Sequence, residues 1–326
     1  MRNTISLFFI IFYCFSFGQS EKLQGNWILE KIRYSNGNLL EINHPLFSSF
    51  IEYQFNGNIL KINGQNMDVE IDSSKISSNF RTLNYKFEKE NLVINESGDN
   101  KIYFFLNQND FLNKYPEFRP KEIDYENKKV FVSNEVIYPQ FNNSKKLDDF
   151  LKDNIPSYSS ICITNNFFEI KFILSKENKI SDVKVIKSIS KAFDEQFVIA
   201  LLKAEKYFRN NTNQDLLMTH RFNFFKMFEG LTNNDERKLN KIYESGRIFF
   251  EKNNFSKAIE KYEQINSLNL TPNLKDRWLY TVEQIYINLG ISYLATNQIE
   301  KSCEVFKKVG DNTNFKVRNY LNTFCK

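Results

Sequence analysis

The sequence predicts a protein of several domains: an antiparallel β-barrel or meander, then an α+β domain, then an all-α domain of helical repeats. Three observations support this order. Short alternating apolar segments fill residues 22–114, a strand–turn–strand–helix–strand pattern lies within 135–228, and a helical motif occurs twice within 235–326. With 326 residues and 33 phenylalanines, the chain has enough apolar area for each domain to bury a core.

The first eighteen residues have the pattern of a secretory signal peptide. Arg2 supplies a positive start, Ile5–Phe17 forms an apolar core, and Gly18 ends a small-x-small exit motif. The core has 13 residues, whereas a helix that spans a bilayer needs ~20. We therefore expect cleavage near Gly18 and a periplasmic or secreted protein. The alternative is an uncleaved anchor.

Residues 22–114 predict the antiparallel β domain. Short runs of alternating apolar residues follow one another, and the dipeptides Asn56-Gly57 and Asn63-Gly64 separate some of them. Asn-Gly is favoured in hairpin turns because both residues tolerate a positive φ. Short strands with local turns are typical of a meander that closes, or half closes, to hide its edges.

Gly25 and Trp27 form a Gly-x-Trp motif in the first predicted strand. The motif and the meander after it resemble the lipocalin-like domains of secreted bacterial proteins. The resemblance implies that Trp27 plugs the closed end of the barrel and that Gly25 lets the backbone pass it. It also implies a pocket for a small apolar ligand such as a lipid, with a packed barrel that holds no ligand as the alternative. The arginine that covers the tryptophan in this family has no clear counterpart, although Arg119 lies just beyond the last predicted strand.

The middle of the chain predicts a linker and then the α+β domain. Residues 115–134 hold two prolines among alternating charges and are interpreted as a linker, in which Lys128–Phe131 could add a strand to either neighbour. The elements expected after it are a helix at 147–155, a hairpin of strands 167–174 and 180–187, a helix at 191–208 and a strand near 219–227. Ser144 is placed to cap the first helix. The sheet-facing stripe of the long helix comprises Phe193, Phe197, Leu201, Ala204 and Phe208.

This order of elements resembles the TonB C-terminal domain, as found in exported proteins of Bacteroidetes-type bacteria. The matching stretches are Tyr138-Pro139, Leu147 with Phe150-Leu151, Ile180–Val185, Phe193–Glu195 and Phe222–Phe224. In that family the domain offers a sheet edge to a short segment of an outer-membrane receptor, by strand addition. The chain lacks the Pro-rich span of a TonB energy transducer, because it has only 6 prolines. We therefore expect a docking module, with a membrane-anchored transducer as an alternative.

Residues 235–326 contain the repeated helical motif. The positions that define it are Gly246, Ala258 and Tyr262 in the first copy and Gly290, Tyr293 and Phe306 in the second. The motif resembles the tetratricopeptide repeat, in which small residues let paired helices approach and aromatic residues fill the space between them. An extension around Thr271–Asn273 separates the copies, and residues 314–324 can form a capping helix.

The resemblance to tetratricopeptide repeats implies a protein-binding groove lined by the first helix of each copy. The groove positions of the first copy are Asn240, Tyr243, Arg247, Phe250 and Glu251. The corresponding positions of the second copy are Gln284, Ile287, Ile291, Leu294 and Ala295. We expect the capping helix to cover the second set because it is apolar, which leaves the first set as the binding groove.

The sequence offers little material for catalysis. There are 2 histidines, of which His44 is expected on a surface loop and His220 among aromatic residues. We predict no catalytic residues, no metal site and no cofactor, since no nucleophile–base pair, ligand cluster or phosphate-binding loop is recognisable. The net charge of +5 is spread along the chain, which argues against nucleic acid as a partner.

Three cysteines follow the predicted leader: Cys162, Cys303 and Cys325. The preferred interpretation is three isolated thiols, and a Cys303–Cys325 pair is the alternative.

The favoured hypothesis is a non-catalytic, protein-binding scaffold of the cell envelope, with a link to TonB-type outer-membrane transport. Its partners would be envelope proteins, such as an outer-membrane receptor or its peptide segment, and it would contact membranes only through them. A carrier of a small apolar ligand in the barrel is the alternative.

Overall fold

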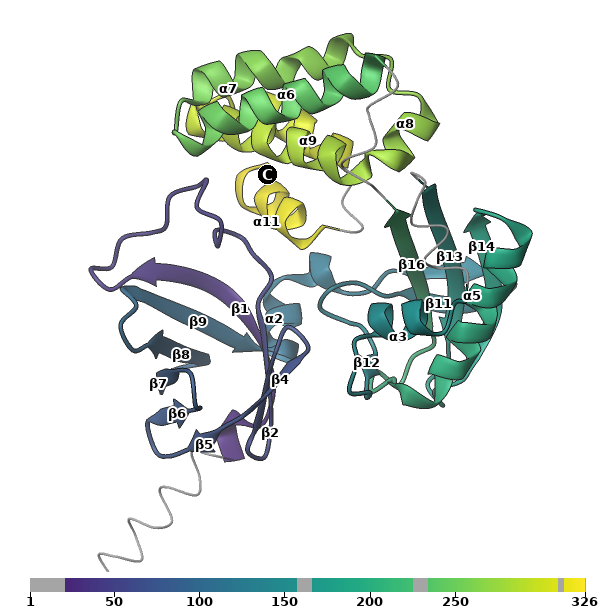
Figure 1. Cartoon of the computed structure of the whole chain (residues 1–326). Coiled ribbons are helices and arrows are strands. Elements are labelled where there is room, and N and C mark those ends of the chain that lie inside the picture. Colours follow the sequence, from purple (N-terminus) through teal and green to yellow (C-terminus); the bar gives the residue numbers. More distant parts are fainter. Residues whose placement is uncertain (1–20, 157–165, 225–233, 310–313, 326) are drawn as a thin grey trace, which may run out of the picture. The chain divides into compact units, whose positions relative to one another are not determined.

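The computed structural model describes residues 21–156, 166–224, 234–309 and 314–325 (Figure 1). The chain divides into two compact units, Met1–Arg119 and Pro120–Lys326.

The first unit is a single antiparallel sheet that curves into a nearly closed barrel. Its strands are β1 (Gly25–Tyr34), β2 (Glu52–Asn56), β3 (Ile59–Ile62), β4 (Gln65–Asp68), β5 (Glu70–Ile71), β6 (Lys75–Ser77), β7 (Thr82–Glu88), β8 (Asn91–Glu96) and β9 (Lys101–Asn107). Their order is β4-β3-β2-β1-β9-β8-β7-β6-β5, so the strands at the two ends are consecutive in the sequence. The predicted antiparallel meander is confirmed.

Trp27 lies at one end of this barrel. Its side chain is buried, its Nε1 donates to the Leu23 carbonyl oxygen at 2.7 Å, and its ring packs 5.8 Å from that of Phe87. Gly25 has a φ of 110°, a conformation that residues with a side chain rarely adopt. The guanidinium of Arg119 binds the carbonyl of Leu112 and the side chain of Asn113, at the end of α2 (Gln108–Lys114).

Residues 115–134, interpreted as a linker, contain ordered secondary structure, and the strand suggested at Lys128–Phe131 is present. A short helix, η1 (Pro116–Phe118), is followed by the strands β10 (Glu122–Tyr125) and β11 (Lys128–Val132). The two strands form a hairpin, and β11 pairs in parallel with a strand more than eighty residues further on. Sequence periodicity did not predict β10, because most of its side chains are exposed.

The second unit begins with a five-stranded sheet of order β10-β11-β16-β13-β14 (Figure 1). Its remaining strands are β13 (Asn166–Leu174), β14 (Ile180–Lys187) and β16 (Leu216–Phe224). A short second sheet pairs β12 (Gln140–Phe141) with β15 (Phe208–Arg209). The expected hairpin and closing strand are present, and residues 225–227 of the predicted strand lie outside the described residues.

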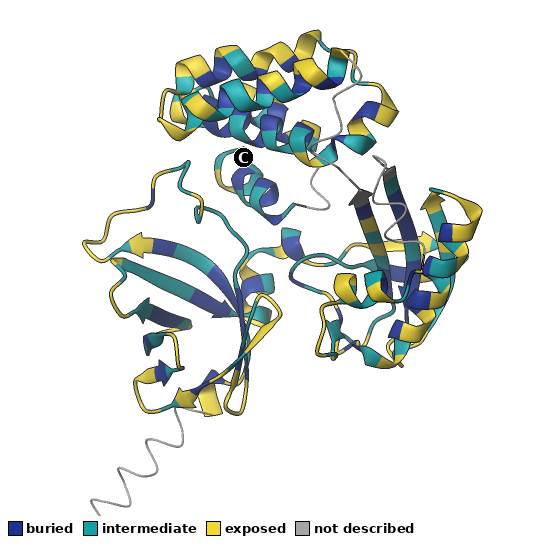
Figure 2. Ribbon diagram, in the orientation of Figure 1, coloured by how far each residue is buried: buried dark blue, intermediate teal, exposed yellow. Residues whose placement is uncertain are grey.

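Two helices cover one face of this sheet: α3 (Leu147–Asp153) and α5 (Lys191–Ala204), the latter continued by the 3₁₀ turn η2 (Glu205–Tyr207). The stripe predicted for this helix is buried (Figure 2). It belongs to the same core cluster as aromatic side chains of β13 and β16. The ring of Phe168, for example, lies 4.6 Å from that of Phe197. The helix ends earlier than expected because Phe208 pairs in β15.

The predicted cap of α3 was wrong. The N-cap position belongs to Lys146, which makes no capping bond with its side chain. Ser144 lies two residues earlier, and its hydroxyl contacts the side chain of Asn143 instead. The cap of α5 is regular, since the Ser190 hydroxyl accepts from the Phe193 backbone N–H at 3.2 Å.

The rest of the second unit is helical. Its helices are α6 (Asn234–Glu251), α7 (Phe255–Tyr262), η3 (Glu263–Ser267), α8 (Pro272–Arg277), α9 (Leu279–Ala295), α10 (Ile299–Val309) and α11 (Phe315–Phe324). The pairs α6/α7 and α9/α10 coincide with the two copies of the sequence motif. The extension between the copies forms η3 and α8, and the Thr271 hydroxyl caps α8 by accepting from the Leu274 N–H.

Glycine permits close contact within each helix pair. A Cβ added at Gly246 would lie 2.2 Å from the Tyr262 ring, and one at Gly290 would lie 2.5 Å from the Phe306 ring. Both rings are completely buried. In the second pair, the Ser302 hydroxyl also donates to the Gly290 carbonyl at 2.8 Å. The two glycines and the two aromatic residues thus occupy equivalent places.

Helix α11 packs on α10 through a stacked pair of rings, Phe306 and Tyr320, 5.1 Å apart. A disulfide joins Cys303 of α10 to Cys325, at the end of α11. The preferred expectation of isolated thiols was therefore wrong for these two residues, because α11 folds back along α10. Cys162 lies outside the described residues.

The close glycine contact predicts a large effect for Gly246→Ala. The added methyl group must displace the Tyr262 ring, so we expect a loss of about 1–3 kcal/mol in the free energy of unfolding, measured by urea denaturation. In a Tyr262→Leu background the same change should cost less, because the ring is gone. An equal cost in both backgrounds would show that the ring contact is not responsible.

The disulfide predicts that α11 depends on oxidation. The bond closes a loop with a sequence separation of 22, and a loop of this size typically contributes about 3 kcal/mol to stability. The Cys303→Ser/Cys325→Ser double variant should unfold at a lower temperature, with faster hydrogen exchange in α11. Reductant should lower the melting temperature of the wild type and leave that of the double variant unchanged.

Candidate functional site

Within the part of the chain that the structure describes, the five-stranded sheet leaves backbone groups unpaired at its two outer edges, β10 and β14. A further unpaired place is the far part of β16, because β11 pairs with β16 only in the register Phe131↔Leu216 and Val132↔Leu217. Open strand edges can accept an additional strand from another chain.

The hydrogen bond next to the open part of β16 shows in which direction the unpaired N–H and C=O groups of this strand point. The Ser133 N–H donates to the Leu217 carbonyl at 3.1 Å, so the backbone groups of Leu217 point away from β13. Since groups alternate along an antiparallel strand, those of Thr219, Arg221 and Asn223 point in the same direction. These three residues present an edge about as long as a short peptide segment.

The β10–β11 hairpin lies against the sheet face opposite α5. Val130 packs there against Ile173 and Leu217 in a small apolar cluster. Two ion pairs tie the hairpin to β14: Lys128 with Asp182 at 2.6 Å, and Glu126 with Lys184 at 3.0 Å. The hairpin therefore covers one end of this face and leaves the open part of β16 beyond it.

The helical part contacts the same sheet. Lys187 of β14 pairs with Asp276 of α8 at 2.9 Å. On the same face as these contacts, Arg221 of β16 pairs with Glu169 of β13 at 2.8 Å, and Glu169 is largely buried. The Lys187–Asp276 pair thus joins the sheet to the helices of the second unit.

The predicted groove residues lie along one side of α6. Asn240, Tyr243, Arg247 and Phe250 are half-buried, and Glu251 is exposed. The guanidinium of Arg247 is already paired within its own helix, at 2.8 Å from Glu244 and 2.7 Å from Glu251. Burial, together with the nearby Tyr280, raises the pKa of Tyr243. The predicted groove residues of α6 are therefore partly accessible, but the charge of Arg247 is already neutralised by Glu244 and Glu251.

The corresponding positions on α9 differ among themselves. Ile287 and Ile291 are buried, whereas Gln284 and Leu294 are half-buried and Ala295 is exposed. Burial within this set is therefore limited to its two isoleucines. Tyr262 of the first helix pair is linked to α9, since Asn288 donates to its hydroxyl at 3.0 Å.

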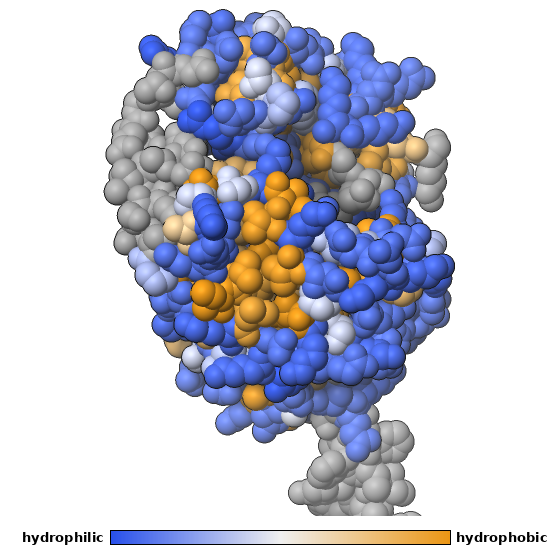
Figure 3. Space-filling view, turned by 90° about the vertical axis from the view of Figure 1, so that its right-hand side faces the viewer, coloured by the Kyte–Doolittle hydropathy of each residue, from blue (hydrophilic) through white to orange (hydrophobic). Residues whose placement is uncertain are grey.

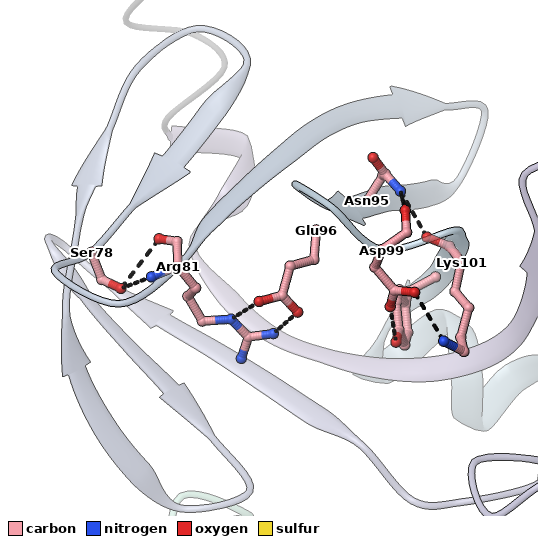
Figure 4. Close-up of polar contacts among 7 residues, drawn as sticks. Ser78, Arg81, Asn95, Glu96, Asp99 and Lys101 are labelled. Carbon is pink, nitrogen blue, oxygen red and sulfur yellow. Dashed lines mark hydrogen bonds and ion pairs between the residues drawn. The ribbon is translucent and has the colours of Figure 1, made fainter.

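The barrel has a polar end, opposite to Trp27, that the sequence did not reveal. Arg81 forms a two-pronged ion pair with Glu96, and the Ser78 hydroxyl and the Arg81 backbone hold the turn before β7 (Figure 4). Asp99 accepts from Lys101 at 2.9 Å and from Tyr103 at 3.0 Å. No local spacing signals this cluster, because its members come from different turns and strands.

The interior below this cluster is filled with side chains. Buried Tyr53, Tyr85 and Phe105 lie there, and the rings of Tyr53 and Phe105 are 4.6 Å apart. Burial raises the pKa of Tyr53 and of Tyr85. The barrel therefore has a large aromatic core, closed at its polar end by paired charges.

The two histidines differ in environment. The His44 Nδ1 accepts from the Leu46 backbone N–H at 3.1 Å in a surface loop. His220 of β16 is largely buried and packs against Phe197 and Phe222, with its Nε2 3.5 Å from an Asp148 carboxylate oxygen. Burial lowers the pKa of His220, and Asp148 opposes that shift.

No cluster of three or more His, Cys, Asp or Glu side chains that could hold a metal is present within the described ranges. None of the described helices is both long and apolar enough to cross a membrane. Comparison of the sequence with models of protein families and with curated proteins gave no match.

The buried His220 predicts a loss of stability in acid. Its pKa is lower in the folded chain than the usual 6.5, so the unfolded chain takes up the proton first as the pH falls. The free energy of unfolding should therefore decrease below about pH 6.5, and less so in His220→Phe. Denaturation at a series of pH values measures this difference.

Asp148→Asn provides the matched control. Without this carboxylate the pKa of His220 should fall further, so the pH dependence should become steeper. Superimposable profiles for the wild type and His220→Phe would contradict a role for His220 in acid sensitivity.

Proposed function

We propose that this chain is an exported cell-envelope protein that acts as a non-catalytic scaffold and binds protein segments along the open edge of its five-stranded sheet. The observation that carries the proposal lies in the stretch Thr219–Asn223 of β16: the backbone groups of Thr219, Arg221 and Asn223 point away from β13 and meet no other strand among the described residues. An extended segment can bind such an edge through backbone hydrogen bonds, without special side chains.

The element order supports a TonB C-terminal-like assignment for this domain. Helix α5 lies between the hairpin β13–β14 and the closing strand β16 in the sequence, and its apolar stripe packs on the sheet. On this assignment the bound segment belongs to an outer-membrane receptor or a similar envelope protein, which would link the chain to TonB-type transport. The β10–β11 hairpin limits the segment to the part of the edge beyond Leu217.

The helical part supplies a second surface under the proposal. The equivalent contacts of Gly246 with Tyr262 and of Gly290 with Phe306 support a pair of tetratricopeptide-like repeats. The half-buried side of α6 would then form the groove. Because Arg247 is paired with Glu244 and Glu251, this groove favours contacts with Tyr243 and Phe250 over recognition of an acidic group.

The disulfide supports an exported location. A bond such as Cys303–Cys325 forms and persists in oxidising compartments, such as the periplasm or the extracellular space. The predicted leader and its cleavage near Gly18 lie outside the described residues. The alternative of a membrane-anchored transducer depends on the same residues, because it requires that the leader stays uncleaved as an anchor. The carrier alternative has less support, because buried aromatic side chains occupy the barrel interior.

Strand addition predicts a specific effect of Thr219→Pro. Thr219 is exposed, and its N–H points to the open side, so proline removes one donor from the docking edge while the bonds to β13 remain. We expect Thr219→Pro to lose most of the envelope protein that the wild-type chain captures from solubilised membranes. Thr219→Val, which keeps the N–H, should retain it.

Hydrogen exchange gives the second measurement. The amides of Thr219 and Arg221 should become protected when the captured protein binds. Equal capture by the proline and valine variants, together with unchanged exchange in β16, would refute docking at this edge.

A further inference from the structure

The solvent face of α5 carries an exposed apolar pair. Ile199 is 54% exposed and Leu202 is 49% exposed, although both lie within a regular helix. The buried stripe of α5 points the opposite way, toward β13 and β16. On the side of the molecule where α5 lies, Figure 3 shows hydrophobic side chains grouped together and bordered by hydrophilic ones.

The pair is the centre of a symmetric pattern. Glu195, Ile199, Leu202 and Lys206 follow one another at spacings of four, three and four residues, so they form one row along the helix and its 3₁₀ extension. The spacing is the same when the row is read from Lys206 back to Glu195. In that direction Leu202 takes the place of Ile199, and Lys206 takes the place of Glu195, which carries the opposite charge. A row of this kind is complementary to itself.

We propose that α5 is a dimer interface, on which a second copy of this chain packs its own α5 in antiparallel orientation. The two-fold axis would pass between Ile199 and Leu202. Each Ile199 would then contact Leu202 of the other copy, and each Glu195 would meet Lys206 of the other copy. A parallel arrangement would instead place like charges together, which is unfavourable.

The dimer is weak and reversible. A helix of 14 residues is about 21 Å long, and a single contact between two such helices buries less area than a standard stable interface. Dimerisation therefore depends on protein concentration. It leaves the edges of β14 and β16 in place, since α5 covers a face of the sheet and not an edge.

Charge exchange tests the proposal on the purified chain, with sedimentation velocity over a wide range of concentrations as the measurement. The wild type should shift from monomer to dimer. Glu195→Lys and Lys206→Glu should each raise the dissociation constant by about tenfold, because each places like charges opposite one another twice. The double variant should restore the wild-type value, and Ile199→Ser should abolish the dimer. All four positions are exposed, so circular dichroism should be unchanged.

Ile299→Ser is the matched control, because Ile299 is a similarly exposed isoleucine on α10. It should dimerise as the wild type does. A wild type that stays monomeric at every concentration, or a double variant as weak as the single ones, would overturn the proposal. Binding to phosphatidylglycerol-containing vesicles that Lys206→Glu weakens and Glu195→Lys strengthens, without any dimer, would assign the surface to lipid and also overturn it.

Discussion

The second unit depends on the burial of both faces of β13. Phe168 and Phe172 point toward α5, while Ile173 points the other way, toward Val130 of the β10–β11 hairpin. A central strand with large apolar residues on both faces is stable only when each face is covered. A single helix layer covers one face, so the chain supplies the hairpin, and contacts from α8, for the other. The residues before the α+β pattern are thus part of the sheet.

The sequence predicted those parts of the fold that local periodicity determines. Phe193, Phe197 and Leu201 recur at helical spacing, and the dipeptides Asn56-Gly57 and Asn63-Gly64 separate strands as expected. Long-range pairing left no such signal. The parallel register of β11 with β16 depends on which surfaces meet in three dimensions, and a single sequence does not record this. The sequence suggested a helix at residues 314–324, but it gave the Cys303–Cys325 pair only as the alternative, because the pair depends on how that helix folds back.

The same distinction applies to the site. Spacing from Gly246 predicted a row along one side of α6, most of it half-buried, because helical geometry alone determines which residues share a side. The open stretch of β16 could not be located, since it results from the shortness of β11. The polar end of the barrel was missed for a similar reason: Arg81 and Glu96 are adjacent only after β7 and β8 pair. The edge, the α6 row and the α5 face lie on different elements, so one unit could engage separate partners at once.

The parallel pairing of β11 with β16 also determines the order in which the chain can fold. Ser133 bonds to Leu217, 84 positions later, so the sheet cannot be completed until both segments are available. Synthesis starts at the N-terminus, so the β-barrel unit can fold before the rest of the chain is made. The strands of this unit pair with their neighbours in the sequence, except that β1 also pairs with β9. The hairpin after it has to wait, with Val130 exposed, until β16 has emerged. Completion of the five-stranded sheet therefore has to follow the synthesis of β16, and contacts of such long sequence separation slow folding.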